Sequence, residues 1–372
     1  MANDANLFTP DRTARAQAAA TSVGLDALLV SPGPDLRYLT GYEALPLERL
    51  TCLVAPAAGD PFLVVPLLEK PAAEVSPVGD LGFEIIGWRE TEDPYELIAK
   101  RLGSSVRRVG LDNHMWAEKV LAFRDAMPGV EQALAGPALA ELRMRKSAAE
   151  IAALSEAATA IDAVHLSVGE WLRPGRTERE VGKDIADAIL AAGHATVDFV
   201  IVASGPNGAS PHHEVSDRVI QAGEPVVVDI GGTMPSGYCS DSTRNYCVGE
   251  APAEYLRLYG VLLAAQTAQC ESIVPGMTSE QLDAIGRDLI AGEGYGDRFI
   301  HRTGHGIGLE THEEPYIVAG SQRVLEPGMA FSVEPGIYLE GQYGARIEDI
   351  AVCTETGGDR LNITSRELRV LA

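Results

Sequence analysis

The sequence predicts an α+β protein with two domains, and three observations lead to this prediction. The chain has 372 residues, and one domain usually takes about 100–200 residues. The first part alternates between helical and strand patterns, which favours a small α/β domain. The second part repeats a helix-then-strand pattern at similar offsets, 101 positions for the helix signals and 105 for the acids that close the strands. Such a repeat favours a larger domain with two pseudo-symmetric halves, although common α/β signals can also coincide by chance.

The first domain is expected over residues 1–140. It opens with an alanine-rich helical pattern. The apolar segments that follow are typical of buried strands, and they cover residues 26–30, 50–54, 61–65 and 83–86. A basic run over 141–146 then leads into a long apolar helical pattern over 148–168. This change in composition places the domain boundary near residue 140, with the second domain over 141–372.

Two segments of the second domain begin with the same helix signal. Thr177 and Thr278, 101 positions apart, each stand three residues before a Glu or Gln. This capping box satisfies unpaired backbone amides at the start of a helix. Apolar residues follow at helical spacing until a glycine, so helices are expected over 177–193 and 278–292.

An acidic residue closes the strand pattern that follows each of these helices. Asp229 and Glu334 end apolar runs, and a second acid follows at hairpin distance, Asp241 or Glu348. A charge at the end of a buried strand needs a partner. If the two halves pack face to face, four carboxylates converge and repel one another unless cations neutralise them. Two divalent ions would balance the four acids.

Three of the eight histidines lie within residues 301–312. The middle one, His305, stands between two glycines that allow the backbone to approach a cluster closely. Oxygen ligands with one imidazole suit Mn²⁺, Co²⁺ or Fe²⁺, and Zn²⁺ is an alternative. Two such ions about 3.5–4 Å apart lower the pKa of a shared water and hold it against a carbonyl. The pattern therefore indicates hydrolytic chemistry.

These motifs resemble those of the pita-bread metallopeptidases, in the proline-specific branch that contains Xaa-Pro dipeptidase (prolidase) and aminopeptidase P. The resemblance extends from residues 35–41 to residues 344–349 and is strongest to actinobacterial-type prolidases. It implies a pita-bread (creatinase/aminopeptidase) fold for the second domain and a creatinase-like fold for the first. It also implies that the first domain contributes to dimerisation and borders the substrate pocket.

The resemblance implies five metal ligands: Asp229, Asp241, His305, Glu334 and Glu348. Asp241 and Glu348 would bridge both ions. Glu334 would also take a proton from the bridging water, whose hydroxide attacks the scissile carbonyl.

Five further site residues are implied by the same resemblance. His212 and His312 would stabilise developing charge on the substrate. His301, Tyr338 and Arg346 would lie near the pocket for proline.

Two of these assignments compete with a second interpretation. His213 is adjacent to His212, which is preferred because it directly follows Pro211. Arg346 could orient Glu348 without contacting substrate, as residues behind metal ligands commonly do.

Composition restricts the partners and the location. The formal net charge of -23 would repel phosphate backbones and anionic lipid, so neither nucleic acid nor a membrane is expected as a partner. The apolar stretches considered, such as 62–68, fall short of the ~20 residues of a spanning helix. Residues 1–6 carry no export signal. A cytoplasmic location is expected, with five scattered cysteines as reduced structural thiols.

The sequence thus predicts a cytoplasmic metallopeptidase that uses two divalent ions, preferably Mn²⁺, to cleave Xaa-Pro dipeptides. Related enzymes form dimers, so a homodimer or a dimer of dimers is expected. The nearest competing function is that of an aminopeptidase P, which acts on longer Xaa-Pro peptides. More distant candidate functions are a metal-free creatinase-like hydrolase, a lyase for a sulfonium compound, and a non-catalytic peptide-binding module.

Overall fold

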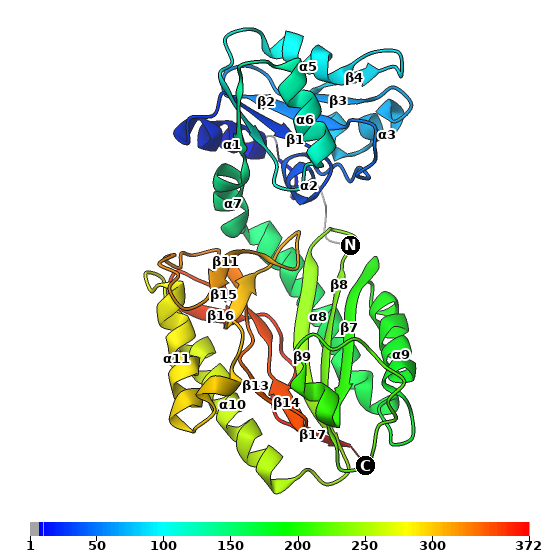
Figure 1. Ribbon diagram of the computed structural model, residues 1–372, viewed down its shortest axis with the longest axis vertical. Helices are drawn as coiled ribbons and strands as arrows, with labels where there is room; N and C mark the ends of the chain where they lie inside the picture. The colour runs from blue at the N-terminus through cyan, green and yellow to red at the C-terminus, as the bar shows by residue number, and fades with distance from the viewer. Residues whose placement is uncertain (1–6, 10, 372) are drawn as a thin grey trace. The chain divides into compact units, whose positions relative to one another are not determined.

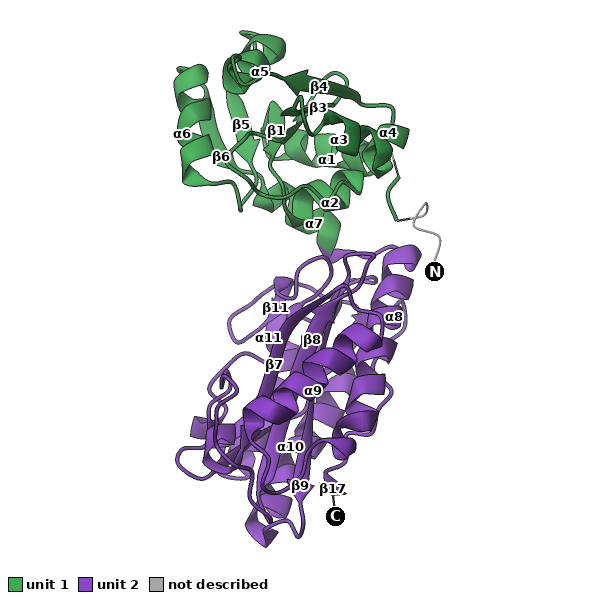
Figure 2. Ribbon diagram, turned by 90° about the vertical axis from the view of Figure 1, so that its right-hand side faces the viewer, with its two compact units in different colours: residues 1–143 green, residues 144–372 purple. Residues whose placement is uncertain are grey.

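The computed structural model describes residues 7–9 and 11–371. The chain divides into two compact units, residues 1–143 and 144–372 (Figure 2). The division falls within helix α7 (Gly136–Met144), three residues after the boundary expected from composition. Residues 1–6, in which no export signal is expected, lie outside the described residues.

The first unit is built around a mixed six-stranded sheet in the order β4-β3-β2-β1-β5-β6. Its central strands are apolar throughout and are buried on both faces, as expected for strands covered by helices. The four strands expected from sequence form β1 to β4, shifted by at most two residues. The strands are β1 (Ala27–Val30), β2 (Cys52–Pro56), β3 (Phe62–Pro66), β4 (Glu84–Trp88), β5 (Arg108–Leu111) and β6 (Glu131–Leu134). The helices are α1 (Asp11–Ser22), α2 (Pro34–Thr40), α3 (Lys70–Val75), α4 (Pro77–Asp80), α5 (Pro94–Leu102) and α6 (Ala117–Ala126).

The first half of the second unit is a four-stranded sheet in the order β17-β9-β8-β7. Helix α8 packs on β8 and β9, and helix α9 packs on β7 (Figure 1). Their apolar faces share one core with the sheet, which includes Ile161, Ile185 and Val228. The elements are α8 (Ala148–Ser167), α9 (Glu178–Ala191), β7 (Thr196–Ser204), β8 (Pro225–Thr233), β9 (Cys239–Val248) and β17 (Arg369–Leu371), with 3-10 helices at Val168–Glu170 and Gly205–Ala209.

The second half contains a five-stranded sheet in the order β11-β10-β12-β15-β16 and a separate β13-β14 hairpin. Helices α10 and α11 pack against each other, and each also contacts strands of this half (Figure 1). The elements are α10 (Ala253–Ser272), α11 (Ser279–Gly292), β10 (Gly304–Gly306), β11 (Glu313–Ile317), β12 (Ala330–Val333), β13 (Gly336–Leu339), β14 (Tyr343–Arg346), β15 (Asp349–Cys353) and β16 (Gly358–Arg360), with a 3-10 helix at Gly296–Arg298.

Both capping boxes form as the sequence predicts. The hydroxyl of Thr177 caps α9 and that of Thr278 caps α11, and in each box the side chain at the third helical position bonds back to the cap. Helix α11 ends at the expected Gly292, and Gly294 takes the left-handed conformation with φ 86° that ends a helix at low cost. Helix α9 ends at Ala191, two residues before the expected Gly193.

The expectation that no segment is long enough to span a membrane is wrong as regards length. Among the described residues, the helical stretch Ala148–Glu170 meets the length and apolarity requirements of a spanning helix. However, 56% of its most apolar window is buried within the structure, where α8 packs on β8, β9 and α9. An apolar helix in the core of a domain shows the same composition.

Candidate metal centre and active site

The two acids of the first half come from adjacent antiparallel strands. Asp229 of β8 pairs with Thr243 of β9, and Gly231 pairs with Asp241. Residues opposite each other, or two positions apart, lie on the same face of a sheet. Asp229 and Asp241 are therefore diagonal neighbours on one face. A side chain at Gly231 would overlap the Phe199 ring, so glycine is needed for this packing.

The two acids of the second half lie just outside paired strands. The β12-β15 ladder ends at the pair Val333 and Asp349, and Glu334 and Glu348 are the next residues on either side. The Glu334 N–H donates to the carbonyl of Thr303, next to β10, at 2.8 Å. The Glu348 N–H donates to the Thr243 carbonyl at 3.3 Å. The second bond joins this half to β9 of the first half. Register and this backbone bond thus bring acids from both halves together.

His305 lies in β10, a three-residue strand paired with β11 and β12. A Cβ on either flanking glycine, Gly304 or Gly306, would overlap a carbonyl oxygen of a neighbouring strand, which explains the Gly-His-Gly pattern. The His305 Nδ1 atom is 3.1 Å from the carbonyl oxygen of Gly306. Its Nε2 atom lies 3.2 Å from a Glu334 oxygen and 3.6 Å from an Asp241 oxygen. With Nδ1 as the donor, the Nε2 lone pair is available to a metal.

The clustered acids perturb one another strongly. Burial, followed by the neighbouring carboxylates, raises the pKa of Asp241 and of Glu348 well above the ordinary values. Burial would also raise the pKa of Glu334, but the hydrogen bond and charge of His305 lower it to about 2. Carboxylates that lie close together in a buried site raise one another's pKa values when no cation is present. The cluster is therefore a site that a cation would stabilise.

The donor set fits divalent ions. Ligand atoms of Asp241, His305 and Glu348 all lie within 4.8 Å of one another. The buried Oδ1 atom of Asp229 has no hydrogen-bond partner among the described residues, although a buried carboxylate oxygen normally has one. Oxygen ligands with one imidazole match the preferences of divalent transition ions. The structure thus brings together all five residues that the sequence proposes as ligands.

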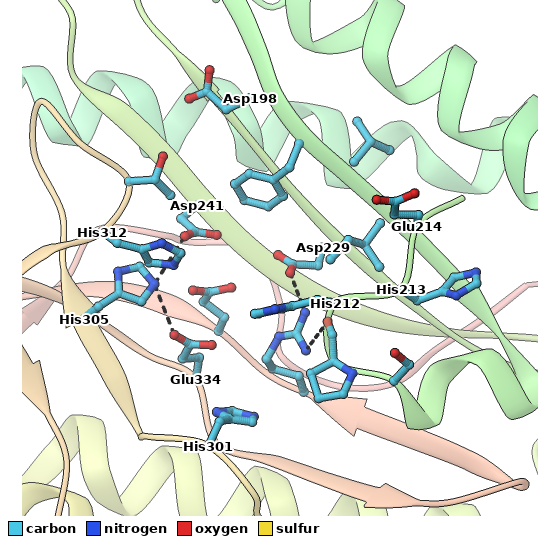
Figure 3. A pocket seen from close by; sticks show the side chains of 18 of the residues that line it. Asp198, His212, His213, Glu214, Asp229, Asp241, His301, His305, His312 and Glu334 are labelled. Atoms are coloured by element: carbon cyan, nitrogen blue, oxygen red, sulfur yellow. Dashed lines mark hydrogen bonds and ion pairs between the residues drawn. The ribbon is translucent and has the colours of Figure 1, made fainter. Parts of the chain in front are cut away.

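The cluster of proposed metal ligands opens onto a cavity of about 1170 Å³ within the second unit. Figure 3 shows the acids and the histidines of the cluster facing this space. The candidate residues that line the cavity are the five proposed ligands together with His212, His301, His312 and Arg346. A cavity of this volume accommodates a dipeptide.

His312 and His212 lie on different sides of the cluster. The ring of His312 packs edge-on against the His305 ring, with 4.0 Å between centroids. Burial, the charge of His305 and that of Arg302 lower the pKa of His312 to about 4. The ring of His212 points toward the side of the cavity that holds the acids of the cluster, and the neighbouring His213 ring points the opposite way (Figure 3). His213 also lines the cavity wall, but its Nε2 atom is hydrogen-bonded to the buried carboxylate of Glu178.

A chain of hydrogen bonds joins the three candidates for the proline pocket. The Tyr338 hydroxyl lies 2.9 Å from His301 Nε2 and accepts from Arg346 Nη1 at 2.9 Å. Tyr338 does not line the cavity, so it connects the other two candidates from behind. Arg346 forms an ion pair with Asp229. Its hydrogen-bond link to Glu348 runs through the hydroxyl of Thr243, so the metal-ligand candidate with which it pairs directly is Asp229.

Sequence reasoning missed Thr243 and several charged residues of the cavity wall, among them Asp198 and Arg302. Thr243 stands opposite Asp229 and donates to a Glu348 oxygen at 2.7 Å. It stands two positions after Asp241, so the period of two along a strand places it on the same face. Asp198 and Arg302 also line the cavity. No motif in the sequence distinguishes these two from ordinary surface charges.

Comparison with known proteins agrees with this architecture. Residues 152–355 match the model of metallopeptidase family M24, and residues 12–145 match the creatinase/prolidase N-terminal domain. The chain is 51% identical to "Probable dipeptidase PepE" of Mycobacterium tuberculosis over 97% of this chain and 96% of that protein. It is 37% identical to the Xaa-Pro dipeptidase of Lactobacillus delbrueckii subsp. lactis over 94% of this chain and 95% of that protein.

A solved structure shows the same fold. The crystal structure of dipeptidase PepE from Mycobacterium ulcerans superposes with a TM-score of 0.92 at 49% identity, covering 97% of each chain. The α+β fold, with a creatinase-like N-terminal domain and a pita-bread C-terminal domain, is confirmed. Divalent metal use follows from the family, and the cluster supplies a candidate site for it. The protein belongs to metallopeptidase family M24.

Proposed function

We propose that the protein is a dinuclear Xaa-Pro dipeptidase. The observation that carries this proposal is the convergence of Asp229, Asp241, His305, Glu334 and Glu348 beside one cavity. One buried oxygen of Asp229 has no hydrogen-bond partner in the described part of the chain, so the cluster has spare ligand capacity beyond its internal hydrogen bonds. The relatives named as dipeptidases and as Xaa-Pro dipeptidases support the choice of substrate.

The residues of the site have different roles in the proposed peptide hydrolysis. Two divalent ions in this site would polarise the scissile carbonyl and activate a water molecule. Glu334 is placed to accept the proton of that water, because it borders both His305 and the cavity. His212 and His312 line the same space and would donate hydrogen bonds to the charge that develops on the carbonyl oxygen.

The bond before proline calls for a dedicated site. Proline has no N–H and a fixed φ angle, so its peptide bond does not fit sites that bind an extended backbone through that group. His301, linked through Tyr338 to Arg346, would form the polar side of the proline pocket. A dipeptidase also binds the free C-terminal carboxylate of its substrate. The arginines that line the cavity, such as Arg302 and Arg346, are suitable partners for this carboxylate.

Three further features belong to the same proposal. We favour Mn²⁺ because the proposed ligand set has four carboxylates and one imidazole. A homodimer or dimer of dimers rests on the resemblance to prolidases, and the cytoplasmic location is the expectation drawn from the sequence. Light scattering at several protein concentrations would test the assembly.

The test is a panel of substrates and metals. The full-length protein, loaded separately with Mn²⁺, Co²⁺, Fe²⁺ or Zn²⁺, would be assayed on Ala-Pro, Ala-Ala and Ala-Pro-Ala-Ala. The proposal predicts fastest hydrolysis of Ala-Pro, two bound ions per chain by elemental analysis, and loss of activity with EDTA. Preference for the tetrapeptide would indicate aminopeptidase P activity, and preference for Ala-Ala would indicate a general dipeptidase. Full activity of metal-free protein would refute the mechanism.

A further inference from the structure

A buried carboxylate outside the metal cluster has an unusually large set of hydrogen bonds. Glu178 is the first residue of α9, immediately after the capping Thr177. An acid at this position normally faces solvent near the positive end of the helix. The side chain of Glu178 is instead 0% exposed and faces the segment that follows β7.

Both oxygens of Glu178 accept bonds from this segment, residues 204–216. Oε1 accepts from the Ser204 N–H and hydroxyl, each at 2.8 Å, and from the Asn207 amide at 3.0 Å. Oε2 accepts from His213 Nε2 at 2.8 Å and from the Ser216 hydroxyl at 2.6 Å. The Asn207 amide and the Ser216 N–H also reach Oε2, at 3.1 and 3.3 Å. One carboxylate thus holds the beginning, the middle and the end of the segment.

The same segment carries His212 into the cavity. The His213 ring is bonded to Glu178, and the ring of the neighbouring His212 points the other way, toward the side of the cavity that holds the acids of the cluster (Figure 3). A second bond fixes the residue before His212, since Arg346 Nη1 donates to the Pro211 carbonyl at 3.3 Å. The direction of the His212 side chain is therefore set by contacts on both of its neighbours.

We propose that Glu178 is a positioning residue for catalysis, which holds the 204–216 segment so that His212 faces the metal centre. The inference rests on the proposed role of His212 in peptide hydrolysis. Glu178 itself does not line the cavity, so it acts on substrate only through this segment.

The role requires an ionised carboxylate. Every contact of Glu178 within the segment is with a hydrogen-bond donor, and an ionised carboxylate is an acceptor at both oxygens. Burial alone would raise the pKa of Glu178, but hydrogen bonds from Ser216, Ser204 and His213 outweigh it and lower the pKa. Glutamine has the same shape but turns one acceptor into an NH₂ donor that faces other donors.

The chain offers a matched control two positions along the same helix. Glu180 is the exposed member of the capping box, and Gln281 fills the equivalent place in α11. Glu180→Gln therefore keeps the box intact, whereas Glu178→Gln disrupts the buried bonds. Any general effect of removing one negative charge from this helix appears in both variants.

The experiment combines hydrogen exchange with kinetics on metal-loaded, full-length protein. Glu178→Gln should raise amide exchange in residues 204–216, and Glu180→Gln should leave it unchanged. On Ala-Pro, Glu178→Gln should lower kcat by about 10- to 100-fold, the range expected for small displacements of a reacting group. Bound metal should remain at the wild-type level in both variants.

A double variant separates positioning from a merely structural role. If Glu178 acts through His212, the effects are not additive. The Glu178→Gln, His212→Ala protein should then be within about twofold of His212→Ala alone. Multiplication of the two losses would overturn the proposal, and so would normal kcat in a Glu178→Gln protein whose segment exchanges faster.

Two further outcomes distinguish the possible failures. Wild-type kcat in His212→Ala would refute the role of His212 and with it this part of the proposed function. Unchanged exchange in Glu178→Gln would refute the anchoring.

A second pair of variants replaces Glu178→Gln if that protein does not fold. They are His213→Ala, which removes the donor to Glu178, and His213→Gln, whose amide can donate to Glu178 as His213 Nε2 does. The kcat lost in His213→Ala should therefore be restored in His213→Gln. Equal losses of kcat in both variants would overturn the proposal.

Discussion

The two halves of the catalytic unit supply similar acids from different kinds of structure. In the first half, β8 and β9 are 9 and 10 residues long, and Asp229 and Asp241 lie inside a ladder without a register shift. In the second half, the strands have three to five residues, and Glu334 and Glu348 lie beyond the ends of theirs. The register between β10 and β11 shifts directly after His305.

This difference shows how one repeated pattern yields an asymmetric site. A regular ladder fixes the relative position of two aspartates through register alone. Short strands interrupted by glycine allow the backbone to turn several times in a small space. In this way the second half brings His301, His305 and His312 to one cavity.

Each half also anchors a cavity segment to its helix. In the first half, Glu178 of α9 holds residues 204–216. In the second half, Asp283 of α11 accepts the Thr303 N–H at 3.2 Å, and Arg287 donates to the His301 carbonyl at 2.9 Å. The two anchors use different residues at different helical positions, so the sequence repeat does not reveal them.

The largest effect is expected from Asp241→Asn, which tests whether the regular half is needed for metal binding. Loss of a bridging charge should reduce bound metal and lower kcat/KM by at least about 10³-fold, because metal ions contribute several kcal/mol to such reactions. Elemental analysis and Ala-Pro hydrolysis measure both. Asp198→Asn is the control, because Asp198 lines the same cavity from β7 but lies outside the cluster.

A smaller loss is expected from His312→Ala, which tests the irregular half without touching a proposed ligand. The kcat should fall by about 10²–10³-fold, as for loss of one stabilising donor, with metal content unchanged. His114→Ala in the first unit, an exposed histidine, is the control. Loss of metal from His312→Ala would show that its role was misassigned.

The first half should also respond to acid through a buried histidine. His165 of α8 lies 3.0 Å from both the Tyr246 hydroxyl and the Ser242 carbonyl of β9. Burial, with repulsion from Arg244, lowers its pKa from 6.5 to about 3. The unfolded chain therefore takes up this proton below pH 6.5, and the folded protein does so only near pH 3.

Stability is consequently lost as the pH falls between these two values. The contribution of His165 approaches about 1.4 kcal/mol per pH unit, or about 2 kcal/mol at pH 5. Urea unfolding at pH 7, 6 and 5 would measure it. His165→Gln should flatten the pH dependence relative to the wild type, and an identical slope in both proteins would contradict the assignment.

The smallest effects should be equal in the two halves. Thr177→Ala and Thr278→Ala each remove one capping hydroxyl from an otherwise similar box. Each should lower the free energy of unfolding by about 1 kcal/mol. A clear difference between them in urea unfolding would show that the halves are less equivalent than their sequences suggest.

The regular half was largely predictable from the sequence. The capping boxes, the strand that contains Asp229 and the hairpin to Asp241 follow from local patterns, because each depends on residues close together along the chain. The strand was expected to end at Asp229, but β8 continues to Thr233 and pairs with β9 along its whole length. The convergence of Glu334 and Glu348 with these acids was expected from the repeat and from family resemblance. A hairpin connection between these two glutamates was expected from their spacing, but its form as a separate two-stranded sheet, β13-β14, was not.

Long-range polar contacts could not be predicted. Glu178 has the sequence of an ordinary helix-start acid, and its partners lie 26 to 38 positions away. The competing interpretation of Arg346 was that it orients Glu348, but its ion pair is with Asp229, 117 positions away. Such pairings depend on how strands are placed in space, and local propensity carries no information about that placement.

The most direct test of the central claim is anomalous diffraction from crystals of the Mn²⁺-loaded protein. The account predicts two anomalous peaks about 3.5–4 Å apart, each within bonding distance of residues from both halves, with Asp241 and Glu348 contacting both ions. A single peak, or ions bound by residues of only one half, would contradict it.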